Sequence, residues 1–356
     1  MDTREYIKTT ITELSTDIQV LFVANVVDKT VIKDFRNTPD SIITEYFTED
    51  EYNQMLLAIR QNGYHVNVFF DEDEFIKFII KHESSAILSK CVVFNLARNG
   101  SGLCKKSLIP SLCDVYKLPS TGSNAYMTCL GRHKFHYNAI LKLNGINAVN
   151  SWSYTGRGWL NGMEPPKNSK LIAKPTYESA SRGVRESSVF EYNTDSMALL
   201  DSLCNEFEQD IIVQEFISGY EVQVPLIIGT EPIALQPVAI TMNHSANLGN
   251  KIITYDLAFS EEYNFTTYAT INKDISDKLV AEAIRTAKCL GMENYGRVDF
   301  RVDTNGGYYI TDISTHPYLI NHSAFAFAFH EMDFEYKDIF ACIIQLAYQK
   351  KRELIF

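Results

Sequence analysis

The segment GRVDFRVDTNGGYYITDISTHP, residues 296–317, predicts two antiparallel strands joined by a tight turn. In its first half, charged residues alternate with apolar ones, and this period of two residues is typical of a half-buried strand. Asn305-Gly306 follows and is a strong hairpin signal, because a type I′ turn needs positive φ at both of its central residues. The segment therefore predicts a hairpin with a two-residue loop.

The predicted hairpin brings two carboxylates face to face. With a two-residue loop, Asp299 lies opposite Asp312 and Arg297 lies opposite Ser314. Directly opposed side chains have Cβ atoms roughly 4.5–5.5 Å apart, and like charges placed in this way are destabilising. A divalent cation would relieve the repulsion, and Mg²⁺ is commonly held by one or two carboxylates together with substrate phosphates. The hairpin is therefore either a metal–phosphate site or a polar strand face in solvent, and this segment alone leaves both open.

The composition is that of an ordinary globular protein. Hydrophobic residues make up 46% of the 356 residues and charged residues 22%, which allows two or three domains with full cores. The formal net charge of −11 argues against nucleic-acid or anionic-membrane partners, although a few local cations could still bind an anion. No signal peptide is visible, no apolar run approaches the ~20 residues that span a bilayer, and the seven cysteines lack zinc spacing. We therefore expect a cytoplasmic protein.

The first third of the chain predicts a small parallel α/β domain. Apolar, β-rich segments at 18–27, 64–70 and 91–96 alternate with two amphipathic segments whose acidic starts predict helices. This β-α-β-α-β order predicts a parallel sheet. The segment 119–123 contains proline and glycine and ends the domain, so we expect a domain of residues 1–122.

The rest of the chain predicts further strands, two long helices and two more domains. The strands are expected at 170–174, 211–216 and 222–229, and the helices at 277–290 and 335–351. Residues 255–270 are polar and aromatic and predict a loop. We divide this region into a central domain, 123–211, and a C-terminal domain, 212–356.

Two further segments carry groups that suit a nucleotide. Lys174 ends an apolar strand before a serine-rich loop, where a lysine can reach phosphate while Ser179 and free backbone N–H groups bind its oxygens. Taken alone, a lysine at this position is more often a solvated strand end. Gln214 and Glu215, followed by Glu221, could contact an adenine ring and a ribose hydroxyl, or could form a polar surface. The GxxxxGK[ST] phosphate loop does not occur in the sequence.

In order along the chain, these segments resemble the ATP-grasp superfamily and, within it, the D-alanine–D-alanine ligase family. KPTYESASRGV from Lys174 is similar to the family's KPxxEGSSxGV, and VQEFISGYE from Val213 is similar to its VEEFIxGxE. RVDF from Arg297 is identical to the family motif, and LPSTGS from Leu118, with RHK ending at Lys134, resembles its IPYTGS…MDK passage. The resemblance implies the family's fold, an α/β fold of three domains with ATP held between two antiparallel sheets.

The resemblance also implies an activity. The family's enzymes phosphorylate a carboxylate with ATP, and an amine then attacks the acylphosphate to form an amide, releasing ADP and phosphate. Such chemistry depends mostly on positioning and charge neutralisation. ATP and one or two Mg²⁺ ions, or Mn²⁺, would be the cofactors, two amino acids the substrates, and a homodimer the assembly.

The motif positions further imply roles for individual residues of this chain. These are Arg297, Lys174 and Ser181 for catalysis; Lys134, Lys174, Glu178, Ser179, Ser181, Gln214, Glu215, Phe216, Ile217 and Glu221 for the nucleotide; Arg297, Tyr318 and Ser323 for the acceptor amino acid; and Asp299, Asp312 and Ser314 for the metal.

Other positions depart from the family pattern. Asp312 and Ser314 stand where the family has Glu and Asn metal ligands, Ala180 replaces the first serine of a pair, and Tyr318 replaces a glycine at the oxyanion site. An aspartate is one methylene shorter than a glutamate, and a hydroxyl is a weaker ligand than an amide oxygen. The two replaced ligands therefore argue against a strong second metal site.

The departures are concentrated in the segments that recognise the first D-alanine. Residues 18–33 lack the GGxSxE passage whose glutamate anchors its ammonium, and the segment 255–263 does not reproduce YEAKY. Because the ATP-binding positions are largely kept, we predict a carboxylate–amine ligase whose first substrate is not D-alanine. The alternatives are a D-alanine–D-alanine ligase of cell-wall synthesis and a non-catalytic ATP-binding or regulatory protein.

Overall fold

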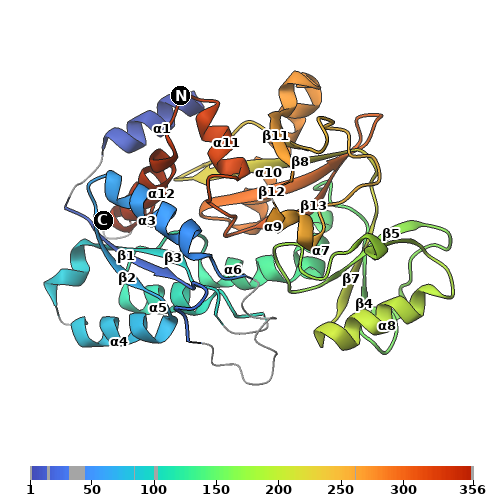
Figure 1. The fold of residues 1–356 in the computed structure, drawn as a ribbon, viewed down its shortest axis with the longest axis horizontal. Coiled ribbons are helices and arrows are strands. Elements are labelled where there is room, and N and C mark those ends of the chain that lie inside the picture. The colour runs from blue at the N-terminus through green and yellow to red at the C-terminus, as the bar shows by residue number, and fades with distance from the viewer. Residues whose placement is uncertain are drawn as a thin grey trace.

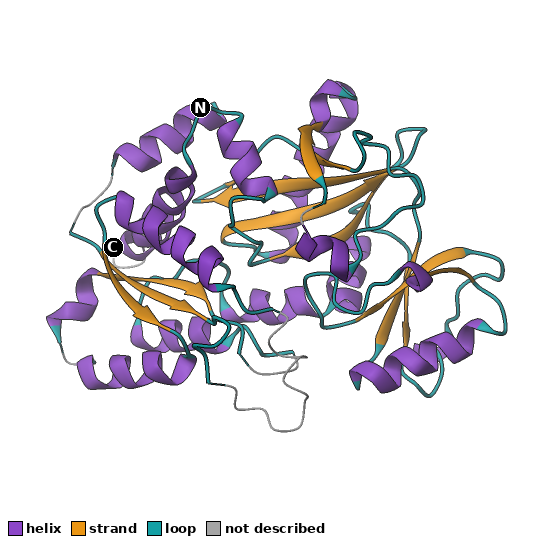
Figure 2. Cartoon of the chain, viewed as in Figure 1, coloured by secondary structure: helices purple, strands orange, loops and turns teal. Residues whose placement is uncertain are grey.

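The computed structural model describes residues 2–13, 17–31, 45–83, 85–99, 103–260 and 262–353. These residues form one parallel and two antiparallel sheets, with helices packed against them (Figures 1 and 2). This arrangement confirms the predicted fold class. The predicted domain boundaries near 122 and 211 stay predictions. None of the helices in the described ranges combines the length and apolarity needed to cross a membrane.

The parallel sheet has the strand order β2-β1-β3. Its elements are β1 (Gln19–Ala24), β2 (His65–Phe69), β3 (Cys91–Leu96), α3 (Glu49–Gln61), α4 (Glu72–His82) and α5 (Leu108–Tyr116). All of β3 and nearly all of β1 are buried, as expected for parallel strands covered on both faces. Thr48 caps α3 by a capping box with Glu51, and the side chain of Asp71 caps α4. The predicted parallel β-α-β-α-β unit is confirmed.

The last helices of the chain complete the core of this first sheet. These are α11 (Ala324–His330) and α12 (Tyr336–Glu353), and α1 (Thr3–Thr12) lies beside α12 (Figure 1). One apolar cluster joins Val20 and Phe22 of β1 to Ile343 of α12, and the rings of Phe94 and Phe340 lie 5.6 Å apart. The first and last segments of the chain therefore share one core.

The central sheet is antiparallel and has the order β4-β7-β5-β6. Its elements are β4 (Ser151–Tyr154), β5 (Lys170–Pro175), β6 (Val189–Glu191) and β7 (Ile211–Glu215), with α8 (Ser196–Phe207) packed against it. The helices α6 (Ala125–Arg132) and α7 (Lys134–Leu143) precede it in the chain. The apolar face of α8 had not been recognised in the sequence.

The C-terminal sheet is also antiparallel, with the order β11-β10-β8-β12-β13 and with β9 paired to β8. Its strands are β8 (Tyr220–Ile228), β9 (Pro232–Ala234), β10 (Val238–Thr241), β11 (Asn264–Thr267), β12 (Asn294–Val302) and β13 (Tyr308–Ser314), and its helices α9 (Tyr255–Ser260) and α10 (Lys273–Leu290). The prediction of a loop at 255–270 was wrong, because this segment holds α9 and β11. The four residues of β11 carry no apolar run, and they are a strand because they pair with β10.

The hairpin of β12 and β13 has the predicted register beside the carboxylates. Arg297 pairs with Ser314, and Asp299 pairs with Asp312. On its other edge, all nine residues of β12 pair with β8, so this strand lies inside the sheet. The opposed carboxylates are therefore held in place by two neighbouring strands.

The loop of this hairpin is not the predicted type I′ turn. The N–H of Asp303 donates to the carbonyl of Gly307 at 2.8 Å, which leaves a three-residue loop, and within it only Gly306 has a positive φ, 85°. The pairing is thereby shifted by one residue from the prediction. A β-bulge next to Asp299 leaves Thr311 unpaired and restores the register beyond it. The predicted pairing of the two carboxylates is correct because the three-residue loop and the bulge each shift the register by one residue, in opposite directions.

Gly122 lies at a buried contact of the segment before α6 with β12, α12 and the residues that follow β13. Its N–H donates to Oδ1 of Asn294 at 2.8 Å, and Nδ2 of Asn294 donates to the carbonyl of Ile343 at 2.9 Å. Gly122 has a φ of 85°, and a Cβ atom placed on it would lie 2.6 Å from Nε2 of His316. Only glycine satisfies both the backbone conformation and the close approach.

We predict that Gly122→Ala lowers the free energy of unfolding by about 2–4 kcal/mol, since it adds overpacking against His316 to the strain of a positive φ. Gly63→Ala is the matched control, because Gly63 has a φ of 83° but open space around its Cβ position. The control should lose only about 1–2 kcal/mol. Denaturant unfolding measures both values, and equal losses would contradict the assignment of the contact with His316.

His316 gives a second prediction. Burial, together with the positive charges of Lys106 and Arg98, lowers its pKa to about 3. As the pH falls below about 6.5, His316 becomes protonated in the unfolded chain but stays neutral in the folded chain. The free energy of unfolding should therefore fall by up to about 1.4 kcal/mol per pH unit. Between pH 6.5 and 4 the melting temperature of His316→Gln should therefore fall less steeply than that of the wild type. If the melting temperatures of the two proteins fell in parallel with pH, His316 would not be the cause of the loss of stability between pH 6.5 and 4.

Candidate active site

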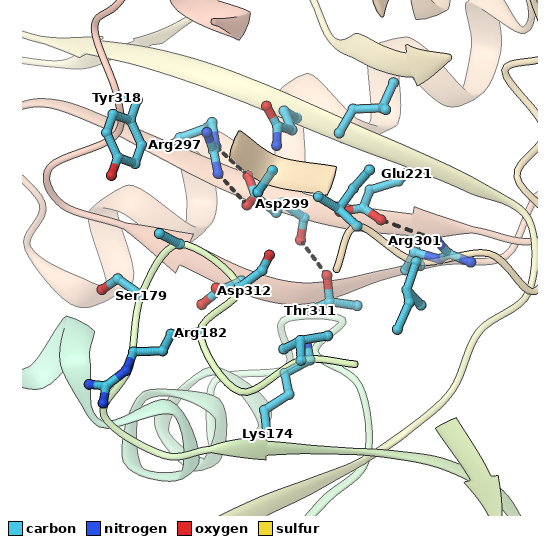
Figure 3. A pocket seen from close by; sticks show the side chains of 18 of the residues that line it. Lys174, Ser179, Arg182, Glu221, Arg297, Asp299, Arg301, Thr311, Asp312 and Tyr318 are labelled. Carbon is cyan, nitrogen blue, oxygen red and sulfur yellow. Dashed lines mark hydrogen bonds and ion pairs between the residues drawn. The ribbon is translucent and has the colours of Figure 1, made fainter. Parts of the chain in front are cut away.

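A cavity lies between the central sheet and the C-terminal sheet (Figure 3). Strands β5 and β7 and the segment 176–182 form one wall, and β8, β12 and β13 form the opposite wall. The cavity brings together every predicted site residue except one. Those that line it are Lys134, Lys174, Glu178, Ser179, Ser181, Gln214, Glu215, Phe216, Ile217, Glu221, Arg297, Asp299, Asp312, Tyr318 and Ser323. Ser314, a predicted metal ligand, does not line it.

The two opposed carboxylates each have a donor of their own. Nε and Nη2 of Arg297 donate to the two oxygens of Asp299 at 2.7 and 2.8 Å. The hydroxyl of Tyr137 donates to Oδ1 of Asp312 at 2.7 Å. Burial raises the pKa of Asp299, and the guanidinium of Arg297 opposes this shift. Arg297 and Tyr137 thus offset the repulsion between the two carboxylates. The second oxygen of Asp312, Oδ2, accepts no hydrogen bond from the described residues and can bind another group.

Lys174 faces the hairpin from the opposite wall (Figure 3). Among the described residues its ammonium has no hydrogen-bond or ion-pair partner, whereas Nζ of Lys134 donates to the carbonyl of Glu178. Burial lowers the pKa of Lys174, and the negative charge of Asp312 opposes this shift. A partly buried cation without a partner is a suitable group for binding an anion.

The segment after β5 presents free amide groups to the cavity. The N–H groups of Ser179, Ala180 and Ser181 find no acceptor within the described part of the chain. Ala180 and Ser181 have φ values of 53° and 55°, which is a strained conformation for residues other than glycine. Successive backbone N–H groups without acceptors are suited to binding an anion.

The far end of the cavity is lined by apolar and amide groups. Phe216 has its ring between Nζ of Lys170, 5.1 Å from the ring centre, and the guanidinium of Arg301 at 5.2 Å. The side-chain oxygen of Gln214 is buried and has no hydrogen-bond partner in the part of the chain that the structure describes. Burial of an unpaired amide oxygen is unfavourable, so a ligand with an N–H donor is expected to complete this end.

Arg301 is a cavity residue that was not predicted. Its Nη1 forms an ion pair with Glu221 at 3.2 Å, and its other nitrogens donate to the carbonyls of Ile217 and Gly249 at 2.8 and 2.9 Å. The alternation of charged residues in β12 was visible in the sequence. The role of Arg301 was not, because its partners lie in other elements.

Two predicted acceptor residues make structural contacts. The hydroxyl of Ser323 accepts from the N–H of Ala326 and caps α11, and the ring of Tyr318 stacks on the guanidinium of Arg98 at 4.7 Å. The predicted roles of these residues, like those of the other site residues, stay predictions.

Comparison with known proteins agrees with the architecture. The family model described as D-ala D-ala ligase C-terminus matches residues 160–345, more than half of the chain. A D-alanine–D-alanine ligase from Marinomonas sp. is 24% identical over 245 residues, 68% of this chain and 73% of that protein. The uncharacterized protein y4sG from Sinorhizobium fredii is 23% identical over 262 residues, 73% of this chain and 75% of that protein.

Solved structures share the fold over nearly the whole chain. The D-alanine–D-alanine ligase from Bacillus anthracis complexed with ATP has a TM-score of 0.68 at 15% identity, covering 94% of this chain and 99% of its own. The D-alanine–D-alanine ligase from Coxiella burnetii has a TM-score of 0.65 at 15% identity, and the match covers 95% of this chain and 97% of that protein's chain. The fold is the ATP-grasp fold.

The chain belongs to the D-alanine–D-alanine ligase family. Members of this family are ATP-grasp ligases that form a carbon–nitrogen bond, so the chain is classed as such an enzyme. The resemblance seen in its sequence motifs is confirmed.

Proposed function

We propose that this ligase activates the carboxylate of one amino acid with ATP and joins it to the amine of a second. The observation that carries the proposal is that three kinds of group meet in one cavity: three amides and the ammonium of Lys174, all without a partner among the described residues, and the opposed carboxylates of β12 and β13. The free amides and Lys174 suit the phosphates of a nucleotide. The relative whose structure was determined in complex with ATP supports this assignment.

The reaction has two steps. An oxygen of the first carboxylate attacks the γ-phosphorus of ATP, the bond to ADP breaks, and an acylphosphate forms. The amine nitrogen of the second amino acid then attacks the acyl carbon, phosphate leaves, and the nitrogen loses a proton. Lys174, Lys134 and the amides of the segment 179–181 would hold the transferring phosphoryl group and neutralise its charge.

The donor set of the hairpin fits one divalent cation. Asp299 and Asp312 are directly paired, and Mg²⁺ commonly takes one or two carboxylates with the remaining places filled by phosphate oxygens and water. In the described part of the chain, no cluster of three His, Cys, Asp or Glu side chains has the geometry of a metal site. We therefore propose one Mg²⁺ that requires bound phosphates, with Ser314 outside the ligand set. When bound, the ion would neutralise charge on the phosphate oxygens.

The first substrate is proposed not to be D-alanine. In the segment that follows β1, the side chain of Asn25 makes its hydrogen bonds within the protein and is not free to bind a substrate. Its amide nitrogen donates to the carbonyl of Phe70 and the carboxylate of Glu72, and its oxygen accepts from the N–H of Arg98. The runner-up is a D-alanine–D-alanine ligase, which the name of the Marinomonas relative favours. The cytoplasmic location and the homodimer stay predictions.

A screen for ADP release over single amino acids and pairs, with mass detection of the product, tests the activity. We expect ADP release to require two amino acids, because the acylphosphate needs an amine to consume it, and D-alanine alone to be a poor substrate. Turnover with D-alanine alone as the best substrate would favour the runner-up. Nucleotide binding without turnover across the panel would instead identify a non-catalytic protein.

Asp312→Asn tests the metal assignment. Its side-chain oxygen can still accept from Tyr137, so the fold should be retained, but it loses the charge that attracts a cation. We expect ADP release to fall at least about tenfold and the Mg²⁺ concentration for half-maximal rate to rise. Asp274→Asn, an exposed position on α10, is the matched control and should behave as the wild type. An unchanged Mg²⁺ titration of Asp312→Asn would overturn the assignment.

A further inference from the structure

Four basic side chains gather around one residue, Glu45, next to the cavity. This cationic cluster consists of Arg98, Lys105, Lys106 and Arg132 around Glu45, and each of the five is 8% exposed or less. Nζ of Lys106 lies 2.8 Å and Nζ of Lys105 3.2 Å from the oxygens of Glu45. Nη1 of Arg132 lies 4.0 Å from the same carboxylate, and Nη1 of Arg98 donates to the backbone carbonyl of Glu45.

The charges of the cationic cluster do not balance. Among the described residues, the ion pairs of its three members Lys105, Lys106 and Arg132 all end on Glu45. Glu178 also attracts Lys105, but it forms an ion pair with Arg182 at 3.0 Å. Buried cations in excess of their partners are strongly unfavourable. An external anion would supply the missing negative charge.

Free hydrogen-bond donors point to the same conclusion. Nε and Nη1 of Arg132, and Nε and Nη2 of Arg98, are buried and donate no hydrogen bond to any of the described residues. The guanidinium of Arg98 lies against the rings of Phe47 and Tyr318, at 4.3 and 4.7 Å from their centres. A fixed guanidinium with free donors matches the paired oxygens of a carboxylate or phosphate.

The cationic cluster adjoins the cavity at two places. Nζ of Lys106 lies 3.2 Å from the hydroxyl of Ser179, which belongs to the segment with the free amides. Tyr318, which stacks on Arg98, also lines the cavity. The basic residues themselves do not line it, whereas Lys174, which is assigned to the nucleotide, faces the hairpin (Figure 3). A substrate in the cavity would reach the cationic cluster past Ser179 and Tyr318.

We infer that the cationic cluster binds a second anionic group, carboxylate or phosphate, on the carboxylic acid that the enzyme activates. This inference rests on the proposed ligase function and specifies its first substrate as an acid with two anionic groups. One group is phosphorylated, and the other is held by Arg98, Arg132 and the two lysines. Burial lowers the pKa of Lys106 to about 7, and a bound anion would raise this pKa and so favour the charged ammonium.

Matched substrates test the inference through turnover. The full-length protein is given ATP, Mg²⁺ and a panel of amine donors with each of three pairs: aspartate and asparagine, glutamate and glutamine, O-phosphoserine and serine. In at least one pair the anionic member should release ADP at least about tenfold faster than its neutral partner, because only the anion balances the buried cations. Equal or better turnover of neutral acids would overturn the inference while leaving the ligase function intact.

Binding of a non-reacting dianion tests the cationic cluster independently of turnover. Without ATP, succinate should raise the melting temperature of the wild type by about 3 °C or more over acetate at equal ionic strength. The rise should be lost in Lys106→Met and in Arg132→Met, two variants that each remove a buried cation. It should persist in Lys278→Met, an exposed control on α10, and in Lys174→Met, which excludes binding at the nucleotide groups.

Turnover and the succinate-dependent melting temperature together distinguish a failure of the anion-site inference from a failure of the proposed ligase function. No rise with succinate, or a rise that persists in both Lys106→Met and Arg132→Met, would overturn the inference whatever the turnover results. A specific rise without ADP release from any amino-acid pair would support the anion site and overturn the ligase function. Because each variant is compared with and without succinate, a change in its own stability does not affect the comparison.

Discussion

The register of β12 between β8 and β13 is the constraint on which the candidate site depends. It places Asp299 directly opposite Asp312, with Arg297 two residues away on the same strand. Since side chains alternate along a strand, a slip of one residue would turn Asp299 away from the cavity. The register is secured by the ladder with β8 along the whole of β12 and by the bulge at Thr311. The position of the carboxylates is therefore a property of the sheet.

Buried charge is distributed unevenly around this sheet. Asp299 is paired with Arg297, and Arg301 is paired with Glu221, so these ions stabilise the wall of the cavity. Lys174 and the cationic cluster, in contrast, carry more positive charge than their described neighbours compensate. In a medium of low dielectric constant such groups attract anions more strongly than they would in water. The proposed nucleotide and the proposed acid substrate would each complete one of these two regions.

Local patterns were enough to predict the parallel sheet, the two helices with acidic first turns, α3 and α4, and the motif segments that line the cavity. They were insufficient where the pattern was short or ambiguous. The sequence AFAFAFH of α11 alternates like a strand, yet it forms a helix that is capped by Ser323 and that buries Phe325 and Phe329 on one side. The loop of the hairpin also differed from prediction, because Asn305-Gly306 forms part of a longer turn.

The sequence by itself determined the fold family and identified many of the residues in the cavity, although not Arg301, because strand periodicity and motif order are encoded by neighbouring positions. Only the tertiary structure decided which charges compensate one another. Glu45, Arg98, Lys106 and Arg132 come from separate segments of the chain and form no local pattern. Their cluster exists because the first sheet, α6 and the residues before α5 pack together, and burial then makes its unbalanced charge significant.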